Sequence, residues 1–318
     1  RGCIVTANNN GIFIGTGGGP ALSHDILLEG NFIHGNGSLT RYYEHNVYNE
    51  ASNVVYQYNH FGPPRGGAQG VLGANIKERS AGVVIRYNWI EDGAHILDIV
   101  DAQEAQATTV PMPSFHSTFV YGNVIVRGRT PSGSMIHYGG DSGVLPTYRK
   151  GTLFFYDNTV IVRNDTYPEW ARTPFFELST NDEHLDSRNN VFWSAVPPTD
   201  SRPVGMLGAR DNVTSGKATF SHDWIRDGIR VDDLSTGSPV KVVAEAAGFD
   251  KATRGTNPGF HGLAGADFGL HAAPAGWTPA PLASEVDAAA LLPTMQYARE
   301  QHGAPRPATP IVPGGLVE

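Results

Sequence analysis

The segment VVIRYNWI at residues 83–90 is one of six stretches that share a pattern of apolar or aromatic residues, an asparagine and a further apolar residue. The others are ILLEGNFI (26–33), VVYQYNHF (54–61), TFVYGNVI (118–125), LFFYDNTVI (153–161) and LDSRNNVF (185–192). Successive asparagines are 28, 29, 35, 35 and 32 residues apart, at Asn31, Asn59, Asn88, Asn123, Asn158 and Asn190. A period of this length, filled with short alternating strands and Gly, Asn and Asp turns, predicts one solenoid coil per repeat.

The repeated asparagine has a structural reason in such a solenoid. Each strand pairs with its equivalent one coil away, about 4.8 Å distant, so equivalent residues stack. We expect the asparagine at a bend, where it tolerates the left-handed conformation and its amide bonds the next asparagine in a ladder. The predicted fold class is all-β, a right-handed parallel β-helix. Hairpin turns of a β-sandwich are the alternative, but they would not keep the same flanking pattern six times.

The repeats define one large domain. We expect a β-helix domain over residues 1–285, with irregular coils at 196–255. In the remaining residues, 286–318, the segment DAAALLPTMQYARE (287–300) favours a short helix. A Pro-rich tail follows, which packs outside the domain or is mobile. The chain opens in strand and turn sequence, so we expect its N-terminus to be truncated or processed.

Composition limits the class of protein. Hydrophobic residues make up 40% of the chain and charged residues 17%, with 38 Gly and 22 Pro, which indicates a turn-rich globular protein. A single cysteine, Cys3, excludes a disulfide framework. No run approaches the roughly 18 apolar residues of a membrane span. We expect a monomer that is secreted or periplasmic, with no membrane partner.

Charge indicates the kind of partner. The net charge of -8 argues against binding nucleic acid. Residues 60–150 carry eight Lys and Arg against seven Asp and Glu, a local balance of +1. An acidic polysaccharide is therefore the expected partner, bound in that part of the chain.

The strands that precede the repeats are predicted to form the exposed sheet face. They read EHNVYNE, ANIKERS, ILDIVDA, MIHYGGD and FFELST. Alternation puts Lys77 and Arg79 on one side of their strand, with Ile76 facing inward. Stacking of the coils gathers a dense polar cluster, which comprises His45, Tyr48, Lys77, Arg79, Asp98, Asp101, His137 and Tyr138. Each of these residues alone has a structural explanation, but unlike titratable groups brought together favour a functional site.

The chemistry that this cluster suggests is β-elimination on a uronic acid polymer. The proton next to a carboxylate is weakly acidic, so an enzyme must neutralise the carboxylate and place a base at the carbon. The fork of Arg79 suits the carboxylate, and Lys77, crowded by Arg79, gives up its proton more readily and can serve as base. The catalytic candidates are Lys77, Arg79, His45 and Tyr48. The substrate-binding candidates are Asn46, Asn75, His137, Tyr138 and Arg149.

The segment GANIKERSAGVVIRYNWI (73–90) resembles the lysine-bearing coil of the alginate lyase and chondroitinase B family, which has an N-K-S strand before an IRxN repeat. More broadly, residues 10–195 resemble the parallel β-helix repeats of bacterial carbohydrate-active enzymes. The resemblance implies a polysaccharide lyase, and Lys77 matches the family's basic lysine. One coil later the family has an arginine in an LTLRHG strand, where this chain has HILDIVDA with Asp98 and Asp101.

A second, shorter resemblance lies near the end of the domain. TNPGF (256–260) and ADFGLHAAPAGWTP (266–279) are similar to the closing coil of bacterial β-helix proteins. That resemblance implies one more coil at this point.

Other functions remain open from the sequence. A glycoside hydrolase needs two carboxylates about 5 to 10 Å apart, and the candidates for them are Asp98, Asp101, Glu104 and Asp141. A uronate epimerase begins with the same proton abstraction as a lyase. A non-catalytic, tail-spike-like protein would bind glycans through aromatic side chains, for which the candidates are Tyr42, Tyr43, Tyr48, Trp89 and Tyr138.

The chain is expected to need either no cofactor or Ca²⁺. Asp98, Asp101 and Glu104 offer hard oxygen ligands at short spacing, which suits calcium. Zinc is not expected, because the histidines lack a short paired spacing and there is no second cysteine.

Overall fold

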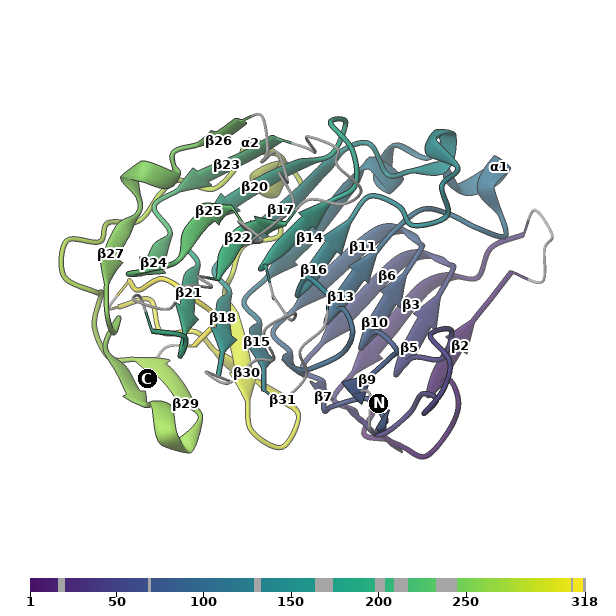
Figure 1. Ribbon diagram of the computed structural model, residues 1–318, viewed down its shortest axis with the longest axis horizontal. Helices are drawn as coiled ribbons and strands as arrows, with labels where there is room; N and C mark the ends of the chain where they lie inside the picture. The colour runs from purple at the N-terminus through teal and green to yellow at the C-terminus, as the bar shows by residue number, and fades with distance from the viewer. Residues whose placement is uncertain are drawn as a thin grey trace.

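The computed structural model describes residues 1–16, 21–67, 70–128, 133–163, 174–197, 204–208, 217–232, 245–309 and 311–316. Three long parallel sheets, of nine, eight and eight strands, run the length of the described chain (Figure 1). Successive strands pass from one sheet to the next, so each coil adds one strand to every sheet. The expected all-β parallel solenoid is confirmed.

The three sheets are named A, B and C. Sheet A consists of β1 (Ile4–Val5), β4 (Phe32–Ile33), β7 (His60–Phe61), β12 (Trp89–Glu91), β15 (Val124–Arg127), β18 (Thr159–Val162), β21 (Val191–Ser194), β24 (Trp224–Arg226) and β27 (Thr253–Gly255). Sheet B consists of β2 (Ile12–Ile14), β5 (Val47–Asn49), β10 (Ile76–Glu78), β13 (Leu97–Ile99), β16 (Ile136–Tyr138), β19 (Phe176–Leu178), β22 (Gly205–Gly208) and β25 (Arg230–Asp232). Sheet C consists of β3 (His24–Glu29), β6 (Ser52–Gln57), β11 (Ala81–Arg86), β14 (Ser117–Tyr121), β17 (Thr152–Tyr156), β20 (His184–Arg188), β23 (Lys217–Ser221) and β26 (Glu245–Ala247).

The remaining elements are short. They are β8 (Gly66–Gly67), β9 (Gly70–Val71), α1 (Gln106–Thr109), α2 (Ser284–Ala288), and four 3-10 turns at Pro113–His116, Leu145–Thr147, Phe249–Lys251 and Leu263–Gly265. The described chain also contains two antiparallel hairpins near its end, β28 (Phe260–Gly262) with β29 (Asp267–Leu270), and β30 (Met295–Ala298) with β31 (His302–Pro305).

The core fills the inside of the coils. In β11, Ala81, Val83 and Ile85 are completely buried, whereas Val84 and Arg86 face outward and are half-buried. The same alternation in the other sheets joins their inward side chains into one continuous apolar cluster. Period-2 alternation in every strand therefore leaves the outward face of sheet B free to carry polar groups.

The asparagine ladder is present at the bend between sheets C and A. Asn59 donates to Asn88 Oδ1 from both its backbone and its side-chain nitrogen, each at 3.0 Å, and Asn88 donates to Asn123 in the same way. All six asparagines are buried. The ladder continues one coil beyond the repeats, because Asp223 Oδ1 accepts the backbone N–H of Asn190 at 2.8 Å.

The expectation that asparagine itself takes the left-handed conformation is wrong. The residue before each ladder asparagine has the positive φ, at Gly30, Tyr58, Tyr87, Gly122, Asp157 and Asn189. The preceding residue makes the bend, and the asparagine side chain is then free to turn inward and reach the next coil.

The stretch expected to be irregular is largely regular where it is described. Residues 196–255 contribute β22 to β27, all of which pair in parallel with the preceding coils. Parts of this stretch, 198–203, 209–216 and 233–244, lie outside the described residues. The segment that resembled a closing coil forms the antiparallel β28–β29 hairpin instead.

The prediction of a helix at 287–300 is also wrong. Helix α2 ends at Ala288, Ala290 has a positive φ, and residues 295–305 form the β30–β31 hairpin. Pro293 disfavours a helix across this segment, because its ring would clash with the carbonyl four residues earlier and it disfavours helical conformation in the residue before it.

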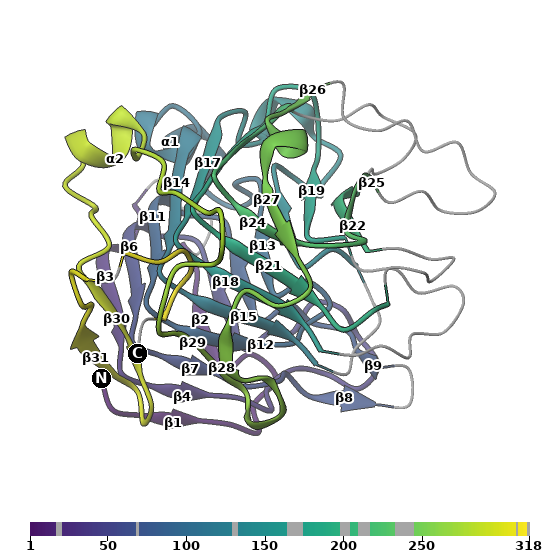
Figure 2. The same ribbon diagram turned by 90° about the vertical axis from the view of Figure 1, so that its left-hand side faces the viewer.

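Residues 277–309 and 311–316, here called the C-terminal strap, run along the outside of the solenoid (Figure 2). Val286 of α2 packs on the tyrosines that stack on the outer face of sheet C. Farther on, Gly314 N donates to Asn189 O at 2.9 Å and Gly315 N donates to Thr159 Oγ1 at 3.0 Å. The Pro-rich tail thus packs outside the domain over its described part. None of the described helices is long and apolar enough to span a membrane.

Candidate functional site

The outward face of sheet B carries one row of polar residues. The central residues of five neighbouring strands are in direct register: Tyr48, Lys77, Asp98, His137 and Glu177. Neighbouring strands lie about 4.8 Å apart, so unlike charged groups are forced into contact along this row.

A pocket of about 500 Å³ opens over the row. It brings together the four residues expected to be catalytic, His45, Tyr48, Lys77 and Arg79. As the alternation predicted, Lys77 and Arg79 lie on the same side of their strand, while Ile76 is completely buried in the core. The rest of the lining comes from Tyr42, Tyr43, Leu72, Ala74, Ala94, His95, Asp98, Gln103, Asp141 and Ser142.

Lys77 is held between two carboxylates. Its Nζ lies 2.5 Å from Asp98 Oδ2 and also bonds Asp141, and the residue is only 5% exposed. The ammonium group is thus engaged by two hydrogen-bond acceptors. The arrangement therefore does not fit the expectation that Lys77 is a base primed by Arg79.

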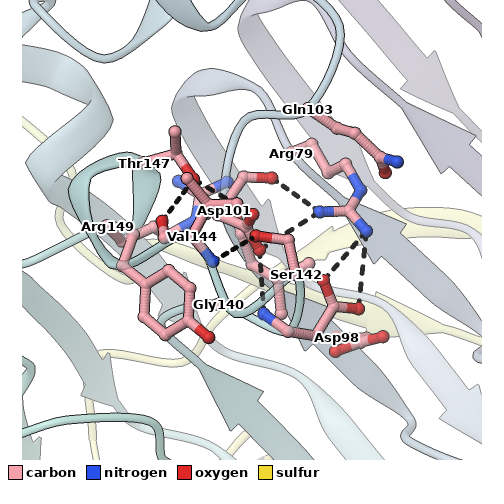
Figure 3. Close-up of polar contacts among 12 residues, drawn as sticks. Arg79, Asp98, Asp101, Gln103, Gly140, Ser142, Val144, Thr147 and Arg149 are labelled. Carbon is pink, nitrogen blue, oxygen red and sulfur yellow. Dashed lines mark hydrogen bonds and ion pairs between the residues drawn. The ribbon is translucent and has the colours of Figure 1, made fainter.

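Arg79 holds the same loop carboxylate. Its NH2 lies 3.0 Å from Asp141 Oδ1, and its NH1 donates to the backbone oxygen of Asp101 at 2.7 Å. Figure 3 shows the guanidinium of Arg79 directed toward Asp101. Burial would raise the pKa of Asp141, but the charges of Lys77 and Arg79 lower it to about 2. The two cations therefore form a seat for one carboxylate, which Asp141 fills.

Asp98 is hydrogen-bonded to His137 on the neighbouring strand. Its Oδ1 lies 2.8 Å from His137 Nδ1, and burial, which would raise the pKa of Asp98, is outweighed by Lys77 and nearby histidines that hold it well below its usual range. Burial would lower the pKa of His137, but its bond to Asp98 and the charge of Glu177 raise it. His137 was expected to bind substrate. Because it is completely buried, it positions Asp98 and does not contact substrate directly.

His45 is fixed in one neutral tautomer. The backbone N–H of Ala74 donates to its Nδ1 at 2.9 Å, so the ring proton must lie on Nε2. Burial, with the charges of Lys77 and Arg79, lowers the pKa of His45 to about 3. The ring is therefore uncharged at neutral pH and presents an N–H donor in the pocket wall.

His95, which sequence analysis did not select, is fixed in the opposite tautomer. Its Nδ1 lies 3.0 Å from the carbonyl oxygen of Ser134, which can only accept, so the proton lies on Nδ1 and the lone pair on Nε2. Burial lowers the pKa of His95. The signal available in the sequence was positional: His45, Ala74 and His95 each stand three residues before a member of the row.

Tyr48 remains a phenol. Its hydroxyl donates to Glu50 Oε1 at 2.8 Å, and burial raises its pKa above the ordinary value, as it also raises that of Glu50. Its ring lies under the guanidinium of Arg79, 5.9 Å from the ring centroid. Tyr48 thus contributes a pocket wall and supports Arg79.

The other four residues expected to bind substrate are interior as well. Asn46 and Asn75 are completely buried and form a second ladder, in which Asn46 Nδ2 donates to Asn75 Oδ1 at 2.9 Å. Tyr138 is an inward residue of β16 in the apolar core. Arg149 is completely buried and donates to backbone carbonyls, including that of Ser80 at 2.9 Å. The sequence did not show that Arg149 faces inward.

The aromatic residues proposed for glycan binding are likewise divided between exposed and buried positions. Tyr42 and Tyr43 are well exposed at the rim of the pocket. Trp89, in contrast, is buried on the outside of sheet A, stacked on Phe268 with ring centroids 5.7 Å apart. Trp89 therefore serves packing, and the two rim tyrosines are the aromatic residues available to a ligand.

The calcium ligands expected from sequence are not brought together. Asp98 pairs with Lys77, Asp101 lies against Arg79, and Glu104 accepts from the hydroxyl of Thr16 at 3.3 Å. This arrangement offers no oxygen cage for Ca²⁺.

One other metal-type grouping occurs in the described part of the chain. The potential ligand atoms of His95, Asp98 and His137 lie within 4.8 Å of one another. However, both oxygens of Asp98 already contact cationic or N–H partners, Lys77 and His137. We therefore assign no metal to this grouping.

Comparison of the chain with family models, curated proteins and solved structures found no match. The geometry of the pocket is therefore the basis on which a function can be proposed.

Proposed function

We propose that the protein is a polysaccharide lyase that cleaves a uronate-containing polymer by β-elimination in the pocket on sheet B. The observation that carries the proposal is the pair formed by Lys77 and Arg79, which together hold one carboxylate, that of Asp141. A uronate carboxylate has the same shape and charge as the aspartate group. We infer that substrate takes the place of Asp141 between the two cations.

The chemistry requires such a seat. β-Elimination removes a proton from the carbon next to the carboxylate, forms a carbon–carbon double bond and breaks the bond to the glycosidic oxygen. Charge develops on the carboxylate as the proton leaves, and preorganised cations in a partly buried pocket stabilise that charge. Lys77 and Arg79 are both nearly buried, which strengthens their interaction with it.

Asp141 is placed to leave the seat. Its side chain is 24% exposed, and it lies in a loop that includes Gly139 and Gly143, both with positive φ. Glycine in that conformation permits a sharp turn that other residues strain. The rim residues Tyr42 and Tyr43 offer flat apolar faces on which neighbouring sugar rings can stack.

The same observations weigh against hydrolysis by Asp98 and Asp141. A glycoside hydrolase needs one carboxyl group that keeps its proton near neutral pH. The pKa of Asp98 lies well below its usual range and that of Asp141 is about 2, so both are ionised. Their cationic partners therefore favour the binding of a carboxylate over general-acid catalysis.

The test is a panel of acidic polysaccharides followed by ultraviolet absorbance of the unsaturated uronate product. We expect one polymer to give that product with the parent protein, and Arg79→Met to lose at least about tenfold in kcat/KM, which corresponds to one charge-assisted hydrogen bond. Lys150→Met, an exposed lysine outside the pocket lining, is the matched control. New reducing ends without unsaturation would indicate a hydrolase, inversion without cleavage an epimerase, and binding without reaction a glycan-binding protein. We also propose a secreted or periplasmic location, where such polymers occur.

A further inference from the structure

We propose that His95 is the general base of this reaction and that His45 donates a hydrogen bond to the substrate from the other side of Ala74. The proposal rests on the proposed lyase function and assigns its proton transfer to a residue that neither the repeat nor the family resemblance selected. It is carried by the opposite tautomers of the two rings.

The lone pair of His95 lies on a nitrogen that is free to accept a proton. Because Nδ1–H is bound to the Ser134 carbonyl at 3.0 Å, the basic nitrogen is Nε2. His95 lines the pocket, and no described residue donates a hydrogen bond to this nitrogen. A carbonyl bond to Nδ1–H also fixes the ring orientation, as a positioned base requires.

Lys77, Tyr48 and His45, the residues expected from sequence to take part in the reaction, cannot act in the same way as they stand. Lys77 is bound by two carboxylates, and the hydroxyl proton of Tyr48 is directed to Glu50. His45 carries its proton on Nε2, because Nδ1 accepts the Ala74 N–H. Of the pocket residues, His95 thus has the neutral nitrogen whose lone pair is free for the transfer.

The surroundings of His95 suit the charge change. The ionisable groups that face it are Asp98 on β13, His137 on β16 and Glu177 on β19. The two carboxylates stabilise the imidazolium that forms on proton transfer, while His137, 5.1 Å away between ring centroids, opposes it. Burial keeps the resting ring neutral, which leaves the base in its active form at neutral pH.

The step balances without a further reactant. His95 Nε2 takes the proton from the carbon next to the uronate carboxylate, and the electron pair of that bond forms the carbon–carbon double bond. The bond between the neighbouring carbon and the glycosidic oxygen breaks, and that oxygen takes a proton from water in the open pocket. The imidazolium of His95 then returns its proton to solvent. A neutral imidazole N–H, such as that of His45, stabilises the charge on the substrate without itself ionising.

Matched glutamine substitutions separate the two roles. A glutamine amide places an N–H donor near the former Nε2 but has no basic nitrogen. We expect His95→Gln to lower kcat by at least about a hundredfold, the usual effect of removing a positioned base. We expect His45→Gln to lower it by less than about tenfold, which corresponds to one altered neutral hydrogen bond. Imidazole added to His95→Ala should restore part of the activity.

Two further measurements do not depend on these substitutions. The kcat/KM of the parent should rise with pH about a midpoint below 6.5, because the pKa of His95 is lowered from that ordinary value, and should be level at neutral pH. Nitrogen NMR of labelled protein should show the proton on Nδ1 in His95 and on Nε2 in His45.

The outcomes distinguish the base assignment from the function. If the parent forms unsaturated product and His95→Gln retains near-parental kcat, the lyase proposal stands and the base assignment is wrong. An Nε2–H tautomer for His95 would overturn the assignment without any substrate. Loss of activity on chelation, with Co²⁺ binding that disappears in His95→Ala, would make His95 a metal ligand instead. No unsaturated product from any polymer would overturn both proposals.

Discussion

Replacement of Asp223 by asparagine should stabilise the protein at alkaline pH. Asp223 occupies the ladder position that asparagine fills in the preceding coils. Its carboxylate is completely buried and accepts hydrogen bonds from the backbone N–H of Asn190 at 2.8 Å, from the same residue's Nδ2 at 2.9 Å and from Ser187 Oγ at 2.8 Å. These neutral donors do not offset the burial of its charge, and burial raises the pKa of Asp223 to about 7.

The sign of the effect follows from proton binding. An unfolded aspartate has a pKa near 3.8, so between that value and about 7 the folded state binds the extra proton. The contribution of Asp223 to stability is therefore present at low pH and is lost as pH rises toward 7. Each pH unit across this interval changes the free energy of unfolding by about 1.4 kcal/mol, so the ionised group costs the folded state up to about 4 kcal/mol at pH 8.

Asparagine is the uncharged isostere of the protonated side chain. Its Oδ1 can accept both Asn190 donors, and its Nδ2 can donate to Ser187 Oγ. We expect Asp223→Asn to raise the free energy of unfolding by about 1 to 4 kcal/mol at pH 8 and by less than half as much at pH 5, which lies only about one pH unit above the unfolded value. Chemical denaturation at the two pH values is the assay, with the exposed Asp287→Asn as control. A variant that is no more stable than the parent at pH 8, or equally stabilised at both pH values, would refute the argument.

Three further substitutions test the pocket. Lys77→Met should lower the free energy of unfolding by about 3 to 5 kcal/mol, measured by denaturation, because it removes the ammonium partner of the buried Asp98 and leaves Asp141 with Arg79 alone; an unchanged midpoint would contradict the ion-pair geometry. Asp141→Asn should tighten binding of the cleaved polymer in calorimetry, because the resident carboxylate no longer competes; weaker binding would show that Asp141 helps to hold the substrate. Tyr43→Ala should raise KM with no change in thermal unfolding, since Tyr43 is 80% exposed; an unchanged KM would remove it from the binding surface.

The sequence predicted features that depend on period. The spacing of the asparagines located the ladder, and alternation placed Lys77 and Arg79 on one face. It did not show which residue of each bend takes the positive φ, because Gly30 and Tyr87 share no side-chain chemistry. The positive φ at this position is determined by the combined packing of the neighbouring side chains.

Contacts between coils were harder to predict. One of the two carboxylates that bind Lys77 comes from Asp141, 64 residues away in a loop whose course has no local signal. Arg149 was predicted to bind substrate, but the loop around it packs inward and its guanidinium donates to the Ser80 carbonyl. His95 has no motif, and its role depends on the carbonyl of Ser134, 39 residues later. Such pairings depend on loop paths between strands, which vary in length from one coil to the next.

The C-terminal strap changes how the coils depend on one another. In a solenoid each repeat contacts only its neighbours, so stability behaves as a one-dimensional sum and the ends can fray independently. Here Gly303 packs against Tyr58, α2 against Tyr87 and Tyr156, and Gly314 bonds the backbone of Asn189. One segment thus contacts several coils, including coils that are not neighbours. Opening of any of these coils must also loosen the strap on the others, so they should exchange their amide hydrogens as a single cooperative unit.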